Sequence, residues 1–201
     1  MEESPGSVDP PRTARPSPRD TKPVGPLEDR IARGTVLMDQ GVLVHFDGAC
    51  EPPRGGGIAT WAFTVEGEGL DFEDSGLAAV PGAPHATNNV AEYVAAIRAL
   101  EYLAQRGYRG SVTLLGDSQL VIRQFTGEYA VRTPHLRSYH ERLHQLGQRF
   151  EKVQFFWIPR EQNARADWLT KQAIRRVLRQ GGNGPPSPDG REPFPGGTPG
   201  P

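Results

Sequence analysis

The chain has 201 residues, and its 23 Lys and Arg nearly balance its 24 Asp and Glu, so the net charge is −1. Its single cysteine, Cys50, excludes an intramolecular disulfide and favours a reducing compartment. The first residues, MEESPGSVDPPR, lack the apolar core of a secretory signal, and no run approaches the roughly 18 apolar residues of a membrane span. We therefore expect a cytoplasmic protein that does not enter a membrane.

Proline and glycine divide the chain into one domain and two tails. Residues 1–35 contain seven of the 20 prolines, and residues 181–201 contain seven more together with seven glycines. Such segments bury too little apolar surface to offset the entropy of ordering them. We expect a disordered proline-rich tail at residues 1–35, a disordered Pro/Gly-rich tail at residues 181–201 and a single domain at residues 36–180.

The two halves of this domain carry opposite charge. Residues 36–97 hold nine acidic residues and one basic residue, which gives −8. Residues 98–179 hold 15 basic and seven acidic residues, which gives +8. Two ordinary solvated faces would explain this pattern. An acidic catalytic cleft beside a basic surface that binds a polyanion would also explain it.

The domain begins with three predicted strands in an antiparallel meander. The apolar run 42–47 has the length of a buried strand, and the loop sequence EPPRGGG follows it. Residues 58–65 are rich in β-formers, and the turn at residues 66–69 leads back into a strand at 70–77.

A long helix is predicted after this meander. Val90, Val94 and Ile97 fall on one helical face. Asn89 can cap the helix at its start, and Gly107 can end it.

The rest of the domain alternates between strands and helices. The predicted strands are 111–115 and 154–158. The predicted helices are 118–125, 133–149 and 163–178. Strands that follow helices add in parallel to a sheet. We therefore predict an α/β fold with a five-stranded mixed sheet, antiparallel in strands 1–3 and with parallel additions 4 and 5, flanked by helices.

Four acidic residues lie near the ends of these elements, and each has an ordinary structural explanation. Asp47 is followed by glycine, which is a common turn pair. Glu92 can complete a capping box. Asp117 and Asp167 can interact with the positive end of a helix. None of these explanations predicts the sequence context in which the four residues occur.

That context resembles the type 1 ribonuclease H family. The motifs are FDG at 46–48, TNNxxE at 87–92, GDS at 116–118 and NxxAD at 163–167, and the similarity covers about residues 42–175. Their order, and the elements on which they lie, match the βββαβαβα scheme of that family. The resemblance implies a ribonuclease H-like fold and hydrolysis of the RNA strand of RNA–DNA hybrids, which leaves 5′-phosphate and 3′-hydroxyl ends.

The resemblance also implies that the four carboxylates bind two Mg²⁺ or Mn²⁺ ions. Asp47 would be shared by both ions, Glu92 and Asp117 would complete one site, and Asp167 the other. Two ions roughly 3.5–4 Å apart can activate water, align a phosphate and stabilise a leaving oxygen. Mg²⁺ prefers oxygen ligands, and the sequence shows no histidine or cysteine cluster that would suit zinc. Repulsion among the carboxylates should raise some of their pKa values in the metal-free protein.

Substrate contacts are implied for polar residues near the starts of the helices. Asn88 and Asn89 correspond to paired asparagines that touch the minor groove, and Gln119 to a further contact there. Thr87 corresponds to a residue that helps to bind a DNA phosphate, and Arg160 is a further candidate. A hybrid is distinguished by its groove shape and 2′-hydroxyls. Loop and cap roles for the asparagines are compatible with these contacts.

The chain departs from many family members in two places. The loop before the last helix contains no histidine, and Arg160 or Glu161 would have to take over part of its role. Residues 126–152 are too few for a basic protrusion in addition to an ordinary helix. The chain therefore resembles a short variant of the family.

Histidine and tryptophan side chains are assigned by their positions in the predicted elements. His45 lies in a strand and is expected to be structural. The other histidines are expected at the surface: His85, His135, His140 and His144. The tryptophans are expected in the core: Trp61, Trp157 and Trp168.

Two alternatives to a hybrid-specific nuclease stay open. One is a catalytically weak nucleic-acid-binding domain, and the other is a nuclease of the same fold that acts on double-stranded RNA. Four carboxylates crowded near phosphates favour catalysis over binding alone. We expect an RNA–DNA hybrid as the partner of a monomeric enzyme.

Overall fold

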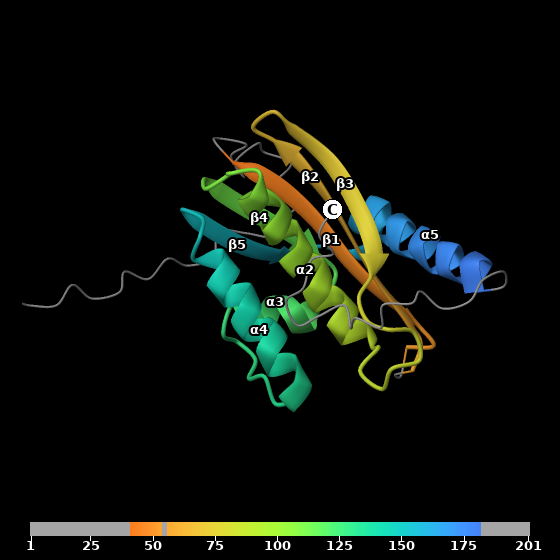
Figure 1. Ribbon diagram of the computed structural model, residues 1–201. Coiled ribbons are helices and arrows are strands. Elements are labelled where there is room, and N and C mark those ends of the chain that lie inside the picture. The colour runs from red at the N-terminus through yellow and green to blue at the C-terminus, as the bar shows by residue number, and fades with distance from the viewer. Residues whose placement is uncertain (1–40, 54–55, 182–201) are drawn as a thin grey trace, which may run out of the picture.

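One five-stranded sheet organises the part of the chain that the structure, a computed structural model, describes: residues 41–53 and 56–181. The strands are β1 (Val42–Glu51), β2 (Ile58–Gly67), β3 (Leu70–Leu77), β4 (Ser111–Gly116) and β5 (Lys152–Trp157). Their order across the sheet is β3-β2-β1-β4-β5 (Figure 1). The pairs β1–β2 and β2–β3 are antiparallel, and β1–β4 and β4–β5 are parallel, which confirms the predicted mixed sheet.

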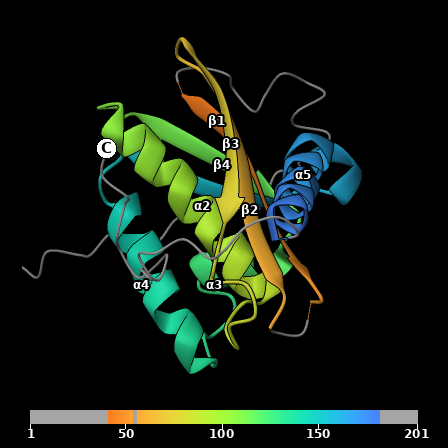
Figure 2. The ribbon, with the colours of Figure 1, turned by 45° about the vertical axis from the view of Figure 1, so that its right-hand side comes forward.

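Helices cover both faces of this sheet. They are α2 (Asn88–Gln105), α3 (Gln119–Phe125), α4 (Pro134–Gly147) and α5 (Ala164–Gly181), and a 3-10 turn, η1 (Arg160–Asn163), precedes α5. Figure 2 shows α2, α3 and α4 on one side of the sheet and α5 on the other. None of the helices in residues 41–53 and 56–181 has the length and apolar character needed to cross a membrane. The predicted tails lie outside the described residues, apart from Gly181 at the end of α5.

The central strand β1 is longer than predicted. Its pairing with β2 continues through Asp47, which lies opposite Ala62, and reaches Glu51 opposite Ile58. The prediction that the strand ends at Asp47 was therefore wrong, because the partner strand β2 has ten residues and pairs with β1 from Leu43 to Glu51. Asp47 is thus held by ladder pairing on a rigid strand.

Close contact between β1 and α2 occurs at Gly48. A Cβ atom added to Gly48 would lie 2.1 Å from the backbone nitrogen of Glu92 and 2.3 Å from the carbonyl carbon of Ala91. Real Cβ atoms do not approach backbone atoms so closely, so only glycine fits here. The absence of a side chain at Gly48 allows the start of α2 to pack directly beside Asp47.

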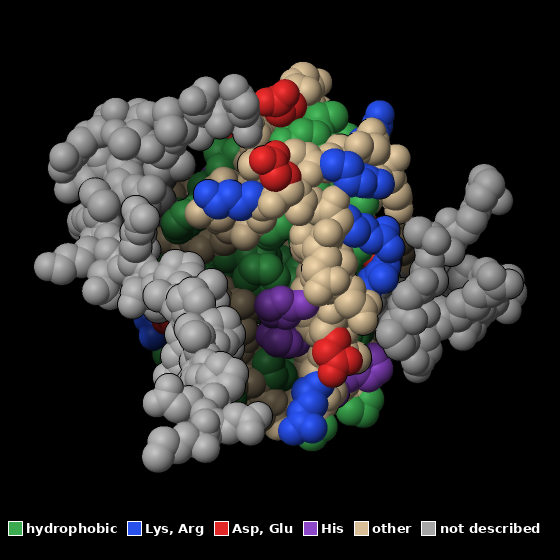
Figure 3. Space-filling model, turned by 90° about the vertical axis from the view of Figure 1, so that its left-hand side faces the viewer, with side chains coloured by type: hydrophobic (Ala, Val, Ile, Leu, Met, Phe, Trp, Pro, Cys, Tyr) green, Lys and Arg blue, Asp and Glu red, His purple; other side chains and the backbone are tan. Residues whose placement is uncertain are grey.

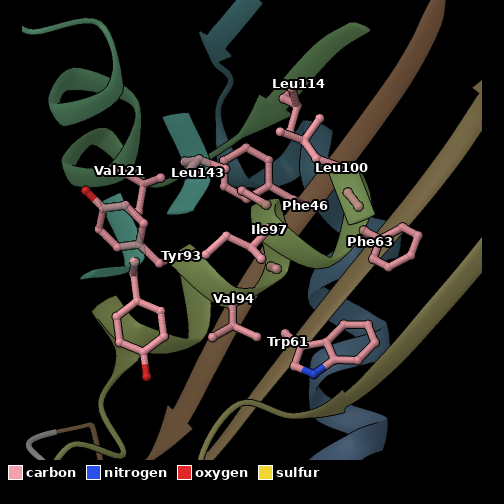
Figure 4. Packing of buried hydrophobic residues seen from close by; sticks show 14 of the residues in the cluster. Phe46, Trp61, Phe63, Tyr93, Val94, Ile97, Leu100, Leu114, Val121 and Leu143 are labelled. Carbon is pink, nitrogen blue, oxygen red and sulfur yellow. The ribbon is translucent and has the colours of Figure 1, made fainter. Parts of the chain in front are cut away.

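The hydrophobic core fills the space between the sheet and α2. Phe46, Ile97, Leu100 and Leu114 are each at most 1% exposed and pack together there (Figure 4). Side chains of a strand alternate between its faces, so Phe46 points toward α2 and Asp47 points away from the main core. This alternation delivers the carboxylate to the α5 side of the sheet.

The start of α2 differs from the prediction in one respect. The N-cap is Thr87, whose hydroxyl accepts a hydrogen bond of 3.3 Å from the backbone N–H of Val90, and Asn89 already lies inside the helix. Glu92 is therefore in the second turn, where it cannot complete a capping box. At the other end Gly107 has a φ of +76°, as expected for a glycine that follows a helix.

The tryptophans follow the prediction only in part. Trp61 is 8% exposed, stacks on Phe63 and donates to the carbonyl of Leu77. Trp157 and Trp168 are 44% and 47% exposed, so their assignment to the core was wrong. Trp157 is the last residue of β5, which is an edge strand with no neighbouring strand on its outer side.

Candidate active site

Asp47 is the most buried of the four predicted carboxylates, with 6% of the residue exposed. The hydroxyl of Thr170, on the buried face of α5, donates a hydrogen bond of 2.8 Å to its Oδ2. The same hydroxyl lies 2.8 Å from the carbonyl oxygen of Asp167, one helical turn earlier. Because a buried carboxylate is costly without a donor, this contact fixes where the Asp47 carboxylate lies.

Asp117 lies beside Asp47 because β1 and β4 are parallel neighbours. His45 pairs with Leu115 in this ladder, and each aspartate follows two residues later. The side-chain amide of buried Asn163 joins the two strand ends, since its Nδ2 donates to the carbonyl of Phe46 at 2.9 Å and to Asp117 Oδ1 at 3.0 Å. The position beyond the carboxyl end of a strand is where open α/β sheets place ligands.

Glu92 reaches the same region from α2. Its Oε1 accepts a hydrogen bond of 2.8 Å from the side-chain amide of Asn88, one turn earlier in the helix. The contact between Gly48 and the backbone of Glu92 brings the helix against β1 at this point. Asn88 thus orients the Glu92 carboxylate, and the absence of a side chain at Gly48 lets the backbone of Glu92 lie against β1.

Asp167 comes from the first turn of α5 and is paired with two cations. Arg160, in η1, contacts its Oδ1, and Lys171 approaches its Oδ2 at 2.5 Å. Both cationic side chains are more than half exposed, whereas that of Asp167 is 14% exposed. The loop before α5 therefore places an arginine beside this carboxylate.

The charges of these carboxylates act on one another. Burial, reinforced by the charges of Asp117 and Asp167, raises the pKa of Asp47 to about 7, although the Thr170 hydrogen bond opposes the change. Burial and the charges of Asp47 and Asp117 raise the pKa of Glu92 well above its usual range. The predicted repulsion between carboxylates is therefore present in the structure. Raised pKa values in a group of acidic side chains are typical of functional sites.

Asp167 responds in the opposite direction. Its partial burial would raise its pKa, but hydrogen bonds from Lys171 and Arg160 outweigh that effect and hold the pKa below the usual value. Asp167 therefore stays charged and balanced by its own cations, whereas at Asp47 and Glu92 the opposing hydrogen bonds and the charge of Arg160 do not outweigh burial.

The donor set fits a hard divalent cation. The four carboxylates offer oxygen, and Mg²⁺ and Mn²⁺ prefer oxygen ligands. A bound cation would also favour the charged forms of Asp47 and Glu92, whose pKa values are raised by burial and by the charges of neighbouring carboxylates. Over residues 41–53 and 56–181, no three His, Cys, Asp or Glu side chains are grouped so that they could hold a metal ion as they stand. The cations on Asp167 engage both of its carboxylate oxygens.

The predicted substrate contacts lie at the starts of helices near these carboxylates. Thr87, Asn88 and Asn89 form the beginning of α2, and Gln119 is exposed at the beginning of α3, immediately after Asp117 and Ser118. Exposed Trp157 adds an aromatic ring at the same edge, where its Nε1 donates to the carbonyl of Asp117 at 3.2 Å.

Sequence reasoning missed Thr170 and Lys171 as partners of the carboxylates. Lys171 stands four residues after Asp167, and this spacing is a usable signal for a helical ion pair. No comparable signal marks Thr170, because its partner Asp47 lies 123 positions away in the chain. Asn163 belonged to a recognised motif, but its two hydrogen bonds become visible only in the fold.

Comparison with known proteins agrees with this architecture. A family model described as reverse transcriptase-like matches residues 46–173. Ribonuclease HI of Halobacterium salinarum is 39% identical over 143 residues, which is 69% of this chain and 68% of that protein.

Two solved structures extend the comparison. LC11-RNase H1, isolated from compost by a metagenomic approach and solved in complex with an RNA/DNA hybrid, superposes with a TM-score of 0.61 at 34% identity, covering 68% of this chain and 99% of that one. The N-terminal RNase H domain of rv2228c from Mycobacterium tuberculosis has a TM-score of 0.62 at 26% identity, covering 70% of this chain and 98% of that one. The chain therefore belongs to the type 1 ribonuclease H family.

Proposed function

We propose that this protein is an endoribonuclease that hydrolyses the RNA strand of RNA–DNA hybrids with the help of divalent metal ions. The observation that carries the proposal is the grouping of carboxylates from β1, α2, the end of β4 and α5, where burial and the charges of neighbouring carboxylates raise the pKa values of Asp47 and Glu92. Its relatives support the same activity, since one is named ribonuclease HI and another was solved with an RNA/DNA hybrid.

The four carboxylates would hold two Mg²⁺ or Mn²⁺ ions, with Asp47 shared between them. When bound, such ions supply an activated water and neutralise charge on the phosphate. Glu92 and Asp117 would complete one site and Asp167 the other. Cleavage on this plan leaves 5′-phosphate and 3′-hydroxyl ends.

The chain's own residues prepare this site by holding each carboxylate in place. The Thr170 hydroxyl favours the charged form of Asp47, Asn163 orients Asp117, and Asn88 orients Glu92. These donors limit the reorganisation needed when a cation arrives, which is the usual role of side chains around metal ligands.

Arg160 would bring positive charge to the scissile phosphate. Its side chain is 63% exposed, contacts Asp167, and adds a favourable charge interaction with Asp47 and with Asp117. A cation in this position can neutralise part of the charge of a phosphate.

Polar side chains at the start of α2 would bind the hybrid. The positive end of that helix and the hydroxyl of Thr87 are suited to a DNA phosphate. Asn88, Asn89 and Gln119 offer amides that can contact sugar edges in the minor groove, where the 2′-hydroxyl distinguishes RNA from DNA.

A cleavage assay tests this function. The purified chain is incubated with an end-labelled RNA–DNA hybrid and with Mg²⁺, Mn²⁺ or a chelator, beside double-stranded RNA and double-stranded DNA. We expect cleavage of the RNA strand of the hybrid only with metal, and its loss in Asp47→Asn and Asp117→Asn. Tight binding of the hybrid without cleavage under either metal would instead identify a nucleic-acid-binding domain. Preferential cutting of double-stranded RNA would identify the other alternative.

A further inference from the structure

A pair of histidines lies on α4, an element that carries none of the four carboxylates. His140 and His144 are one helical turn apart, both are half-buried, and their Nε2 atoms are 3.1 Å apart. Figure 3 shows histidine side chains side by side on one face of the molecule. Both side chains are partly accessible, as the surface assignment expects, but that assignment did not anticipate that helical spacing and the neighbouring α3 bring the two rings together.

A backbone carbonyl completes this cluster. The carbonyl oxygen of Gln124, near the end of α3, lies 3.2 Å from Nε2 of His140. The Nε2 atom of a neutral imidazole carries either one proton or one lone pair. If it carries a proton, the carbonyl and His144 must share it. If it carries a lone pair, that pair faces the lone pairs of the carbonyl. The carbonyl also accepts from the backbone N–H of Gly127 at 3.2 Å, so one proton on Nε2 of His140 cannot form a full hydrogen bond to both the carbonyl and His144.

A metal ion would satisfy all three atoms, because each has a lone pair to offer. Imidazole nitrogens bind Zn²⁺ at roughly 2.0–2.1 Å. Two nitrogens 3.1 Å apart then subtend an angle of about 95–100° at the ion. This angle suits neighbouring positions around Ni²⁺ or Cu²⁺ and lies near the tetrahedral angle of Zn²⁺. The 3.2 Å separation from the carbonyl has the length of another edge of such a polyhedron.

The rings are held in this orientation by packing. His144 stacks on Phe125 with ring centres 4.5 Å apart and planes 9° apart, and Phe125 in turn packs on Phe155 of β5 at 4.2 Å. Tight support of a ligand ring reduces the entropy lost when an ion binds. Burial, together with the neighbouring His140, lowers the pKa of His144, which favours the neutral ring that metals require.

We propose that His140 and His144, together with the carbonyl oxygen of Gln124, form a second metal site that takes a transition-metal ion such as Zn²⁺ or Ni²⁺. Water would complete the coordination, since both rings are partly accessible. The ion would tie the end of α3 to the middle of α4. This site is chemically distinct from the carboxylate cluster, because Mg²⁺ is a hard ion that prefers oxygen, whereas imidazole suits Zn²⁺, Ni²⁺ and Cu²⁺.

Calorimetric titration of the untagged full-length chain with Zn²⁺ and with Ni²⁺ tests the proposal. Excess Mg²⁺ is present throughout, so that the carboxylates are occupied by a hard ion. We expect one saturable site for the transition metal per chain. His140→Gln and His144→Gln should each weaken its affinity by at least about tenfold, because losing a partner of a ligand already costs 10–100-fold.

His135→Gln is the matched control, since His135 is an exposed histidine on the same helix. It should bind the ion as the unchanged protein does. Thermal melting without transition metal shows whether each variant is folded, and added Ni²⁺ should raise the melting temperature of the unchanged protein and of His135→Gln only. The proposal is overturned if the unchanged chain shows no saturable binding, or if the folded His140→Gln and His144→Gln variants bind as tightly as it does.

Discussion

The hydroxyl of Thr170 lies 2.8 Å from the carboxylate of Asp47, and this contact joins helix α5 to the central strand at the candidate active site. Thr170 is fully buried, so water cannot replace the hydroxyl. Its hydrogen bond lowers the pKa of Asp47, against a burial effect that raises it. Thr170 is therefore the donor that keeps a buried carboxylate available in its charged form.

Replacing Thr170 by valine should weaken metal binding at neutral pH. Valine has the shape of threonine but no donor, so the pKa of Asp47 should rise further and less of the carboxylate should be charged. A hydrogen bond to a charged group contributes about 1.5–3 kcal/mol, which corresponds to roughly tenfold or more in affinity. The Mg²⁺ dependence of hybrid cleavage and Mg²⁺-induced thermal shifts measure the effect.

Thr170→Ser is the control, because serine keeps the hydroxyl and loses only a methyl group. The Thr170→Ser variant should keep most of the Mg²⁺ affinity that Thr170→Val loses. If serine and valine are equally impaired, the methyl group and its packing are what matter.

Asp47→Asn should stabilise the metal-free protein at pH 8. The pKa of Asp47 is about 7 in the fold against a usual value of 3.8, so the folded state holds a proton that the unfolded state releases between those pH values. The free energy of unfolding therefore falls as pH rises from about 4 to about 7, by up to roughly 4 kcal/mol, and then levels off. Asparagine removes this penalty while still accepting from Thr170.

Urea unfolding in the presence of a chelator, at pH 4.5 and at pH 8, measures this effect. Asp47→Asn should raise the free energy of unfolding only slightly at pH 4.5 and strongly at pH 8. A variant that is less stable than the parent at pH 8 would show that the buried charge is already compensated within the fold.

Gly48→Ala should destabilise the protein and disturb the site together. The new Cβ would lie 2.1 Å from the backbone nitrogen of Glu92, so β1 and α2 must separate. Overpacking of this kind costs typically about 1–3 kcal/mol. Chemical denaturation should show a lower free energy of unfolding, and the rate of hybrid cleavage should fall.

Gly147→Ala provides a matched comparison, because a Cβ there meets atoms only at 3.8 Å and beyond. This substitution lies at the end of helix α4 and should be neutral or slightly stabilising. Equal effects of the two substitutions would contradict the close contact at Gly48.

Lys171→Gln should strengthen metal binding modestly. Lys171 lies 2.5 Å from Asp167 and competes with a cation for its carboxylate. Exposed ion pairs contribute about 0–1 kcal/mol, so the apparent Mg²⁺ affinity should rise by at most about fivefold. Arg175→Gln, which removes an equal charge from an exposed position on the same helix, should change it less. The prediction fails if both variants shift the affinity alike.

Local patterns in the sequence were sufficient for the order and type of the elements. Strand β3 (Leu70–Leu77) has the predicted bounds, because turn residues flank a run of β-formers. The apolar face of α2 contains Val90, Val94 and Ile97, and all three are buried as predicted. Such patterns depend on spacings of a few residues, which the sequence displays directly.

The sequence by itself determined the fold class, the order of elements and four acidic residues in recognisable motifs, because each depends on neighbours within a few positions. Only the tertiary structure decided what those acids contact. Thr170 contacts Asp47, which lies 123 positions away in the chain. Asn163 contacts Phe46 and Asp117, which lie 117 and 46 positions away. The sequence displays the four-residue spacing of His140 and His144, but it does not show that His140 lies against the Gln124 carbonyl at the end of α3. Contacts of this kind arise when packing of the core brings distant segments together, and no local pattern encodes them.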